Sequence, residues 1–401
     1  MVILACHFIG ADSASAQGWT QSYGGYLPWT AVCSSSDGSI VWASSTNGPI
    51  FYSTNSGSTW QWMDWNNPSY TTGMACSQDA TIVAAVTGNL APGLIYVTTD
   101  FGTNWPAVAV PAEDWTCVAC SANGGDMVAA ATNGVVYLST DTGTNWAPCA
   151  VPDEYWISIA MSGDGSQIAV VATNGPVCVS TNGGDTWTTN NPSGDVVADL
   201  PGGRFKSDTS SGSGDTNWQA VACSADKTKL YAAAVGGPIY ISTNAGSTWT
   251  ASMSPGTNWL ALACSADGTR IIAAVKNGPI YTSTNSGAVW ISNNIPSFPW
   301  SGVSSSADGG KLVAVSGTYN YEAPIYTLQY PVSPSMKIAV VSNCLSLAWI
   351  KPSTNFVVQE SADLQTWTAL GNSLTLDLSN LEDQVTVPMT NSAGFYRLIT
   401  L

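Results

Sequence analysis

The sequence predicts an all-β protein, a seven-bladed β-propeller followed by a small β-sandwich-like domain. Three observations lead to this prediction: one short motif recurs six times, most copies lie about 41 residues apart, and short alternating hydrophobic runs with tight-turn signals fill the intervals. A period near 40 residues matches one four-stranded propeller blade. We divide the chain into a signal peptide over residues 1–17, a propeller over 18–330 and a C-terminal domain over 331–401.

The repeated motif starts with Ser-Thr or Thr-Thr, continues with Asn or Asp, and closes with Gly-x-x-Trp. Its third position is held by Asn55, Asp100, Asp141, Asn182, Asn244 and Asn285. The closing tryptophans, at positions 60, 105, 146, 187, 249 and 290, are 45, 41, 41, 62 and 41 residues apart. An Asn or Asp side chain can hydrogen-bond its own backbone, and Gly supplies a positive φ. We therefore expect the motif to be a structural turn with its Trp packed over a hairpin.

Each repeat contains the signals of four strands. In one copy, a first strand beginning at Trp259 leads to an Asp267-Gly268 turn, and a second strand ends at the hairpin signal Asn277-Gly278. A seventh repeat begins at Trp300 but lacks the motif and an outer strand. Residues 18–22 read as a spare outer strand, and we predict that they complete this last blade and so protect its edge.

Composition excludes several classes of function. The chain carries 10 Lys and Arg against 26 Asp and Glu, a net charge of −16, and has no basic stripe, so nucleic-acid binding is not expected. It contains no apolar run long enough to span a membrane. Residues 1–17 hold an apolar run and an Ala14-Ser15-Ala16 cleavage pattern, which predicts secretion.

The only histidine, His7, lies in the predicted signal peptide. Its removal would exclude His-based catalysis and His metal ligands from the mature chain. We expect neither a metal nor a cofactor.

The motif resembles the Asp-box (BNR) repeat, known from propellers of sialidases, sortilin-type receptors, photosystem assembly factors and secreted bacterial proteins. A sialidase would imply three arginines that clamp the substrate carboxylate. Because the predicted propeller contains only Arg204 and Arg270, we exclude that activity. Most of its Asp residues lie in repeated turns, so a carboxylate-dependent glycosidase is a weaker alternative. We expect a non-enzymatic protein.

Three features of one propeller face are candidates for ligand binding. The first is a ring of aromatic residues at the starts of the inner strands: Trp29, Tyr70, Trp115, Trp156, Trp218, Trp259 and Trp300. The ring fits either packing between blades or an exposed platform for sugars. The second is a set of acids, Glu113, Asp114, Asp153 and Glu154, and the third is an insert over residues 190–217 that carries Arg204 and Lys206. A solvated acidic rim and a tolerated surface insertion are the plainer explanations.

The cysteines also follow the repeat. We assign Cys33, Cys76, Cys120, Cys223 and Cys264 to one position in five blades, with Met161 and Ser305 in two others. Equivalent positions in different blades do not approach closely enough for a disulfide, so free buried thiols are expected. Cys117, Cys149 and Cys178 lie off this pattern and could pair among themselves.

These observations predict a secreted, non-catalytic binding protein that recognises a polysaccharide or a cell-surface partner. A structural or assembly component of the cell envelope is the alternative, and a glycoside hydrolase-like enzyme is less favoured. The C-terminal residues 331–401 predict a small β-sandwich through alternating runs such as residues 344–349 and 384–388.

Overall fold

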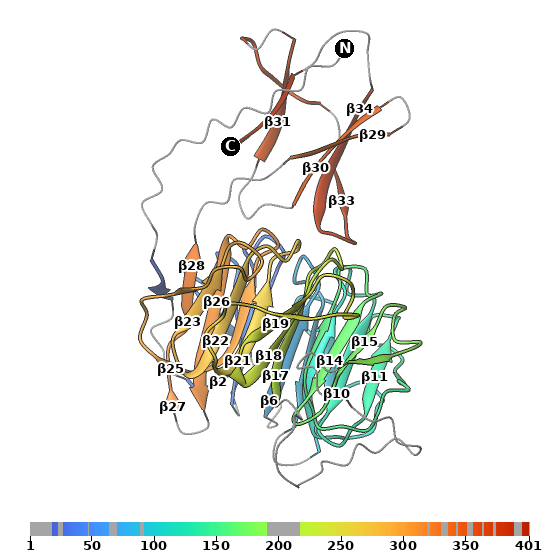
Figure 1. The fold of residues 1–401 in the computed structure, drawn as a ribbon, viewed down its shortest axis with the longest axis vertical. Helices are drawn as coiled ribbons and strands as arrows, with labels where there is room; N and C mark the ends of the chain where they lie inside the picture. Colours follow the sequence, from blue (N-terminus) through green and yellow to red (C-terminus); the bar gives the residue numbers. More distant parts are fainter. Residues whose placement is uncertain are drawn as a thin grey trace.

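The computed structural model describes residues 18–22, 27–46, 48–63, 70–88, 92–190, 217–318, 321–329, 336–341, 344–350, 356–362, 365–371, 374–388 and 395–400. Every regular element in these ranges is a β-strand, and no helix there is long and apolar enough to cross a membrane. The strands form a β-propeller and a separate C-terminal β module, which Figure 1 shows at one end of the propeller. The predicted all-β propeller is confirmed.

Seven antiparallel units can be followed along the described propeller strands, each running from an inner strand outward. The first three are β2 (Trp29–Ser34), β3 (Val41–Ser45), β4 (Ile50–Ser53) and β5 (Gln61–Met63); β6 (Thr71–Cys76), β7 (Val83–Thr87) and β8 (Ile95–Thr98); and β9 (Trp115–Cys120), β10 (Met127–Ala131), β11 (Val136–Ser139) and β12 (Ala147–Pro148). The next two are β13 (Trp156–Met161), β14 (Ile168–Ala172), β15 (Val177–Ser180) and β16 (Thr188–Asn190); and β17 (Trp218–Cys223), β18 (Leu230–Gly237), β19 (Ile239–Ser242) and β20 (Thr250–Ala251). The last two are β21 (Thr257–Cys264), β22 (Ile271–Gly278), β23 (Ile280–Ser283) and β24 (Ile291–Ser292); and β25 (Phe298–Ser305), β26 (Lys311–Thr318), β27 (Tyr321–Glu322) and β28 (Tyr326–Gln329).

The N-terminal strand β1 (Thr20–Gln21) supplies the outer strand of the seventh unit. It pairs antiparallel with β28, Thr20 opposite Thr327, and the Ser22 amide donates to the Ile325 carbonyl at 2.8 Å. The side chain of Trp19 packs into the cluster between the sixth and seventh units, where the repeated motif supplies a Trp elsewhere. Residues 18–22 therefore occupy the position that the sequence assigns to them, and they also provide the missing tryptophan.

Apolar clusters between neighbouring units form the propeller core. Each cluster combines Val, Ile and Ala from the second strands with one or more large aromatic rings. Trp156, for example, is fully buried among residues of the third and fourth units. Because each unit buries one sheet face against each neighbour, the ring is stable only when it closes.

Two kinds of turn lie at the same end of the units. We call this end of the propeller the turn face. In the turn after each inner strand, a Ser hydroxyl donates to an Asp two residues later, as Ser35 Oγ does to Asp37 Oδ1 at 2.6 Å, or to Asn123 in the third unit. In the repeated motif, the Asn55 side chain accepts from Ser53 Oγ at 2.9 Å and from the Thr59 amide at 2.8 Å. The residue after it, Ser56, has a positive φ of 57°.

The motif turns are held in the same way in all six copies, with Asn55, Asp100, Asp141, Asn182, Asn244 and Asn285 accepting these hydrogen bonds. Their role in the described structure is to shape the turn.

Backbone hydrogen bonds link the inner turns of successive units into a circle around the channel. The residue between the Ser and the Asp or Asn of each turn donates its amide to the carbonyl of the equivalent residue in the next unit, as in Ser36 to Gln78 at 2.7 Å and Ala122 to Gly163 at 2.8 Å. Ala307 of the last unit donates to Ser36 of the first at 2.6 Å, which closes the circle. Between the fifth and sixth units the donor is shifted by one residue, to Asp226.

The C-terminal module consists of two small antiparallel sheets. One has the order β29 (Lys337–Val341), β30 (Cys344–Ile350), β34 (Glu382–Pro388), β33 (Thr375–Asp377), and the other the order β32 (Thr368–Ala369), β31 (Phe356–Ser361), β35 (Phe395–Thr400). Leu347 and Trp349 of β30 and Val385 of β34 are fully buried in its core.

Deletion of residues 18–22 should lower the melting temperature of the full chain by roughly 10 °C, because it removes a paired strand and the half-buried indole of Trp19. Thermal unfolding followed by circular dichroism measures the shift. The control is Gln21→Ala, which keeps the backbone pairing and changes an exposed side chain. An unchanged melting temperature for the deletion would mean that β1 does not close the ring.

Candidate functional site

The six tryptophans of the predicted aromatic ring lie inside the propeller wall. Trp29, Trp115, Trp156, Trp218, Trp259 and Trp300 are at most 3% exposed. Five of these rings, all but that of Trp156, pack edge-on against an aromatic of the third strand, as Trp259 does on Tyr281 with centroids 5.6 Å apart. The proposed sugar platform is therefore wrong for these six, because a buried ring has no free face on which a sugar can stack.

In the second unit the ring position belongs to Thr71 and not to Tyr70. Thr71 pairs with Thr87 as Trp29 pairs with Ser45 and Trp115 with Ala131. Tyr70 precedes the strand, is half-buried, and lines a cavity at the channel mouth. The sequence predicts the ring position at Tyr70 because Tyr70 is the aromatic residue adjacent to Thr71, which holds that position in the structure.

That cavity, of about 670 Å³, lies at the end of the channel where the inner strands begin, which we call the Trp face. Hydroxyls from four units line it: Thr30, Thr72, Thr116 and Ser301. Each of them donates to a backbone carbonyl, as Thr72 Oγ1 does to Trp115 O at 2.6 Å. Ile157, Leu260 and Pro299 supply apolar wall, so the cavity can accept a ligand of mixed polarity.

Two charged side chains also line the cavity. Asp114 is half-buried, and its Oδ2 accepts from Thr132 Oγ1 at 3.3 Å. Lys276 is exposed and makes no hydrogen bond or ion pair with the described residues. Sequence reasoning missed Lys276, although its place directly before the Asn277-Gly278 hairpin signal could have indicated it.

Of the four predicted acids, Asp114 alone is among the residues that line this cavity. Glu113 forms a backbone bridge with Gly93, and its carboxylate accepts from the Asn133 side chain. Asp153 is exposed, and Glu154 is half-buried beside Gly175. These acids lie in the connections between units on the Trp face, as expected. Arg204 and Lys206, with the rest of the insert over 191–216, lie outside the described residues.

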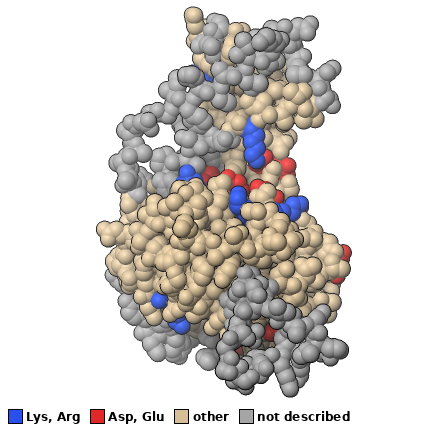
Figure 2. Space-filling model, in the orientation of Figure 1, with Lys and Arg blue, Asp and Glu red and all other residues tan. Residues whose placement is uncertain are grey.

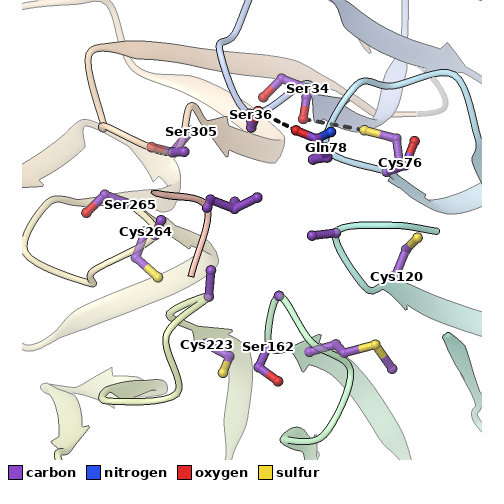
Figure 3. A pocket seen from close by; sticks show the side chains of 18 residues that line it. Ser34, Ser36, Cys76, Gln78, Cys120, Ser162, Cys223, Cys264, Ser265 and Ser305 are labelled. Atoms are coloured by element: carbon purple, nitrogen blue, oxygen red, sulfur yellow. Dashed lines mark hydrogen bonds between the residues drawn. The ribbon is translucent and has the colours of Figure 1, made fainter. Parts of the chain in front are cut away.

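The opposite end of the channel is lined by thiols and small side chains. Cys76, Cys120, Met161, Cys223, Cys264 and Ser305 line this space from six units, and Ser34 lines it from the first. Figure 3 shows Cys76, Cys120, Cys223 and Cys264 around it. The assignment of Cys33 to this set was wrong by one residue: Cys33 pairs with Trp42 and is buried between the first and second units. Ser34 takes the channel position, and Cys76 Sγ donates to its carbonyl at 3.4 Å.

The nine described cysteines are free thiols, so Cys117, Cys149 and Cys178 form no disulfide. All three pack around one cluster between the third and fourth units. Burial raises the pKa of Cys117, Cys178 and Cys264 to about 12. No group of three or more His, Cys, Asp or Glu side chains that could hold a metal ion forms within the described ranges.

Comparison with known proteins places the chain among β-propellers by fold. YCF48 from Cyanidioschyzon merolae is similar, with a TM-score of 0.56 and 15% identity over 78% of this chain and 98% of that one. A structure described as YCF48 bound to D1 peptide is also similar, with a TM-score of 0.57 and 15% identity over 80% of this chain and 98% of that one. No family model and no curated protein matches the sequence.

Trp259→Ala should lower the free energy of unfolding by about 3–5 kcal/mol, because it opens a cavity in a core cluster. Chemical denaturation measures this loss. Tyr70→Ala is the comparison, since it truncates a half-buried side chain at the cavity and should cost much less. Equal stability of Trp259→Ala and the wild type would contradict a packing role for the ring.

The channel and core thiols should react slowly with a disulfide reagent at pH 8. A pKa raised from 9.0 to about 12 reduces the thiolate population, and hence the rate, by roughly a thousandfold before any steric shielding is counted. The absorbance of the chromophore that the reagent releases gives the rate of thiol modification in native and in unfolded protein. Rapid native labelling of Cys117 or Cys264, located by mass spectrometry, would contradict their burial.

Proposed function

We propose that this propeller is a non-catalytic module that binds a peptide segment of a partner protein at the Trp-face cavity. The observation that carries the proposal is the cavity itself, which combines the Lys276 ammonium, paired with no described side chain, with a carboxylate and apolar wall at the mouth of the channel. Peptides offer the complementary groups: acidic and apolar side chains together with backbone donors and acceptors. The fold shared with a YCF48 structure described as bound to a D1 peptide supports this choice, since it shows that such a propeller can hold a peptide.

A polysaccharide ligand is less well supported. Its main argument was the tryptophan ring, and those rings are buried. Among the described aromatics of the Trp face, Tyr70 is half-buried and lines the cavity, and Tyr155 is 70% exposed. We propose, from residues 1–17, that the mature chain acts outside the cytoplasm, where either ligand class is available.

Selection from a phage-displayed library of random peptides, with the full chain as bait, tests the proposal. Lys276→Glu should lower the affinity for the selected peptides by at least about tenfold, because it replaces the cation of the cavity with an anion. Lys229→Gln is the control: Lys229 lies on the turn face, where its ammonium donates to the Asp267 carbonyl at 2.6 Å, and its loss should leave affinity unchanged.

A glycan array probed in parallel separates the two ligand classes. Failure to select any peptide, together with a glycan signal that Tyr70→Ala abolishes, would overturn peptide binding in favour of sugar binding. Peptides that bind wild type and Lys276→Glu equally would show that the site lies elsewhere.

A further inference from the structure

The turn between β33 and β34 of the C-terminal module reaches the turn-face end of the propeller channel. Leu381 lines the same cavity as the channel thiols and the inner turns. Figure 1 shows β33 directed at the propeller, and Figure 3 shows a segment in the orange-red of the C-terminal residues at the centre of the ring. We propose that residues 378–381 are a built-in plug that closes this end of the channel.

The propeller side of the contact departs from its own repeat at one position. The middle residue of the Ser-x-Asp or Ser-x-Asn turn carries a side chain in six units, as Ser36, Gln78, Ala122, Ala225, Ala266 and Ala307, and is Gly163 in the fourth. A methyl group on Gly163 would lie 2.7 Å from the Leu378 carbonyl oxygen and 3.0 Å from that of Ser379. The glycine thus makes room where the plug backbone passes. Its φ is not positive, so the turn itself does not require glycine.

The plug side shows a second departure. Leu381 has a φ of 57°, a conformation that favours Gly or Asn over a bulky aliphatic residue. The space that it lines is bordered by Cys120, Cys223 and Cys264, by alanine methyl groups and by polar side chains, mainly serines. The thiols and methyl groups offer apolar contact to the half-buried Leu381 side chain, and this contact offsets part of the unfavourable backbone conformation.

The turn is held rigid before it meets the propeller. Asp377 Oδ1 accepts from the Ser379 amide at 2.9 Å and from its hydroxyl at 2.6 Å. Asn380 bonds to the amide and carboxylate of Glu382, which also pairs with Lys337. A preorganised turn loses little entropy on docking.

The charges where the C-terminal module meets the propeller are compatible with docking. Asp377 faces Asp164 of the fourth unit, which would repel it. Burial raises the pKa of Asp164, but the Lys227 ion pair, at 2.6 Å, and hydrogen bonds from Ser162 and Ser166 outweigh this and hold it at about 2. Lys227 therefore compensates the charge of Asp164, the propeller carboxylate that acts on Asp377. Figure 2 shows charged side chains of both signs gathered along this boundary.

Gly163→Ala in the full chain tests the plug. The added methyl collides with the plug backbone but matches the other units, so it should release the module without unfolding the blade. Small-angle scattering should show a larger radius of gyration. A bulky maleimide should label Cys120, Cys223 and Cys264 roughly tenfold faster, because the channel end has opened.

Leu381→Asn is the second variant, because Asn suits the positive φ while it removes the aliphatic contact. It should accelerate the same labelling. Gly371→Ala is the control, since no atom lies within 4 Å of the added methyl. If both variants scatter and react like the wild type, the proposal is overturned. It is also overturned if Gly163→Ala lowers the melting temperature while Leu381→Asn leaves the labelling rate unchanged, because Gly163 would then be required only for packing within the propeller.

Discussion

The circle of backbone hydrogen bonds on the turn face is the constraint from which the rest of the propeller follows. It joins the inner turns of neighbouring units and closes from Ala307 to Ser36. Because main-chain groups make these bonds, they tolerate any side chain, but they hold the inner strands close together. That proximity places Cys, Ser, Met and Ala side chains around a narrow channel and forces large rings out of it. The tryptophans accordingly pack between units, at the opposite end of the inner strands.

Closure of the ring requires the two chain ends of the propeller to meet. Trp19, near the N-terminal end, packs against the last unit and so contributes to this closure. In six units the motif Trp seals the cluster against the preceding unit, as Trp249 does between the fourth and fifth. The seventh unit has no motif, and Trp19 seals its cluster from the other end of the chain. Ser22 then accepts a hydrogen bond from Trp60 Nε1 at 2.9 Å, which ties the closing strand to the first unit as well. The closing segment thus bridges both sides of the seam.

The repeat predicted the fold well because each of its signals is local. The Ser-x-Asp turns, the Asn or Asp of the motif and the following Gly act within a few residues, so the sequence shows them directly. The site was harder to predict because exposure is a property of neighbouring units. The tryptophans start their strands as expected, yet only packing decides that Trp259 is covered while Tyr70 remains half-buried. Lys276 carries no repeated signal at all, and its importance comes from the cavity around it.

The two ends of the channel differ in a way that bears on function. At the Trp face the lining combines hydroxyls, apolar side chains and the charged Asp114 and Lys276, and it has room for a ligand of several residues. At the turn face the described lining consists of thiols, hydroxyls, an amide and methyl groups without a charged side chain, and a leucine of the same chain already lies there. A soluble partner with charged and polar groups would gain more at the first end than at the second. A C-terminal module seated on the uncharged end would leave the charged end facing the solvent, so its position on the propeller would determine which mouth a partner can reach.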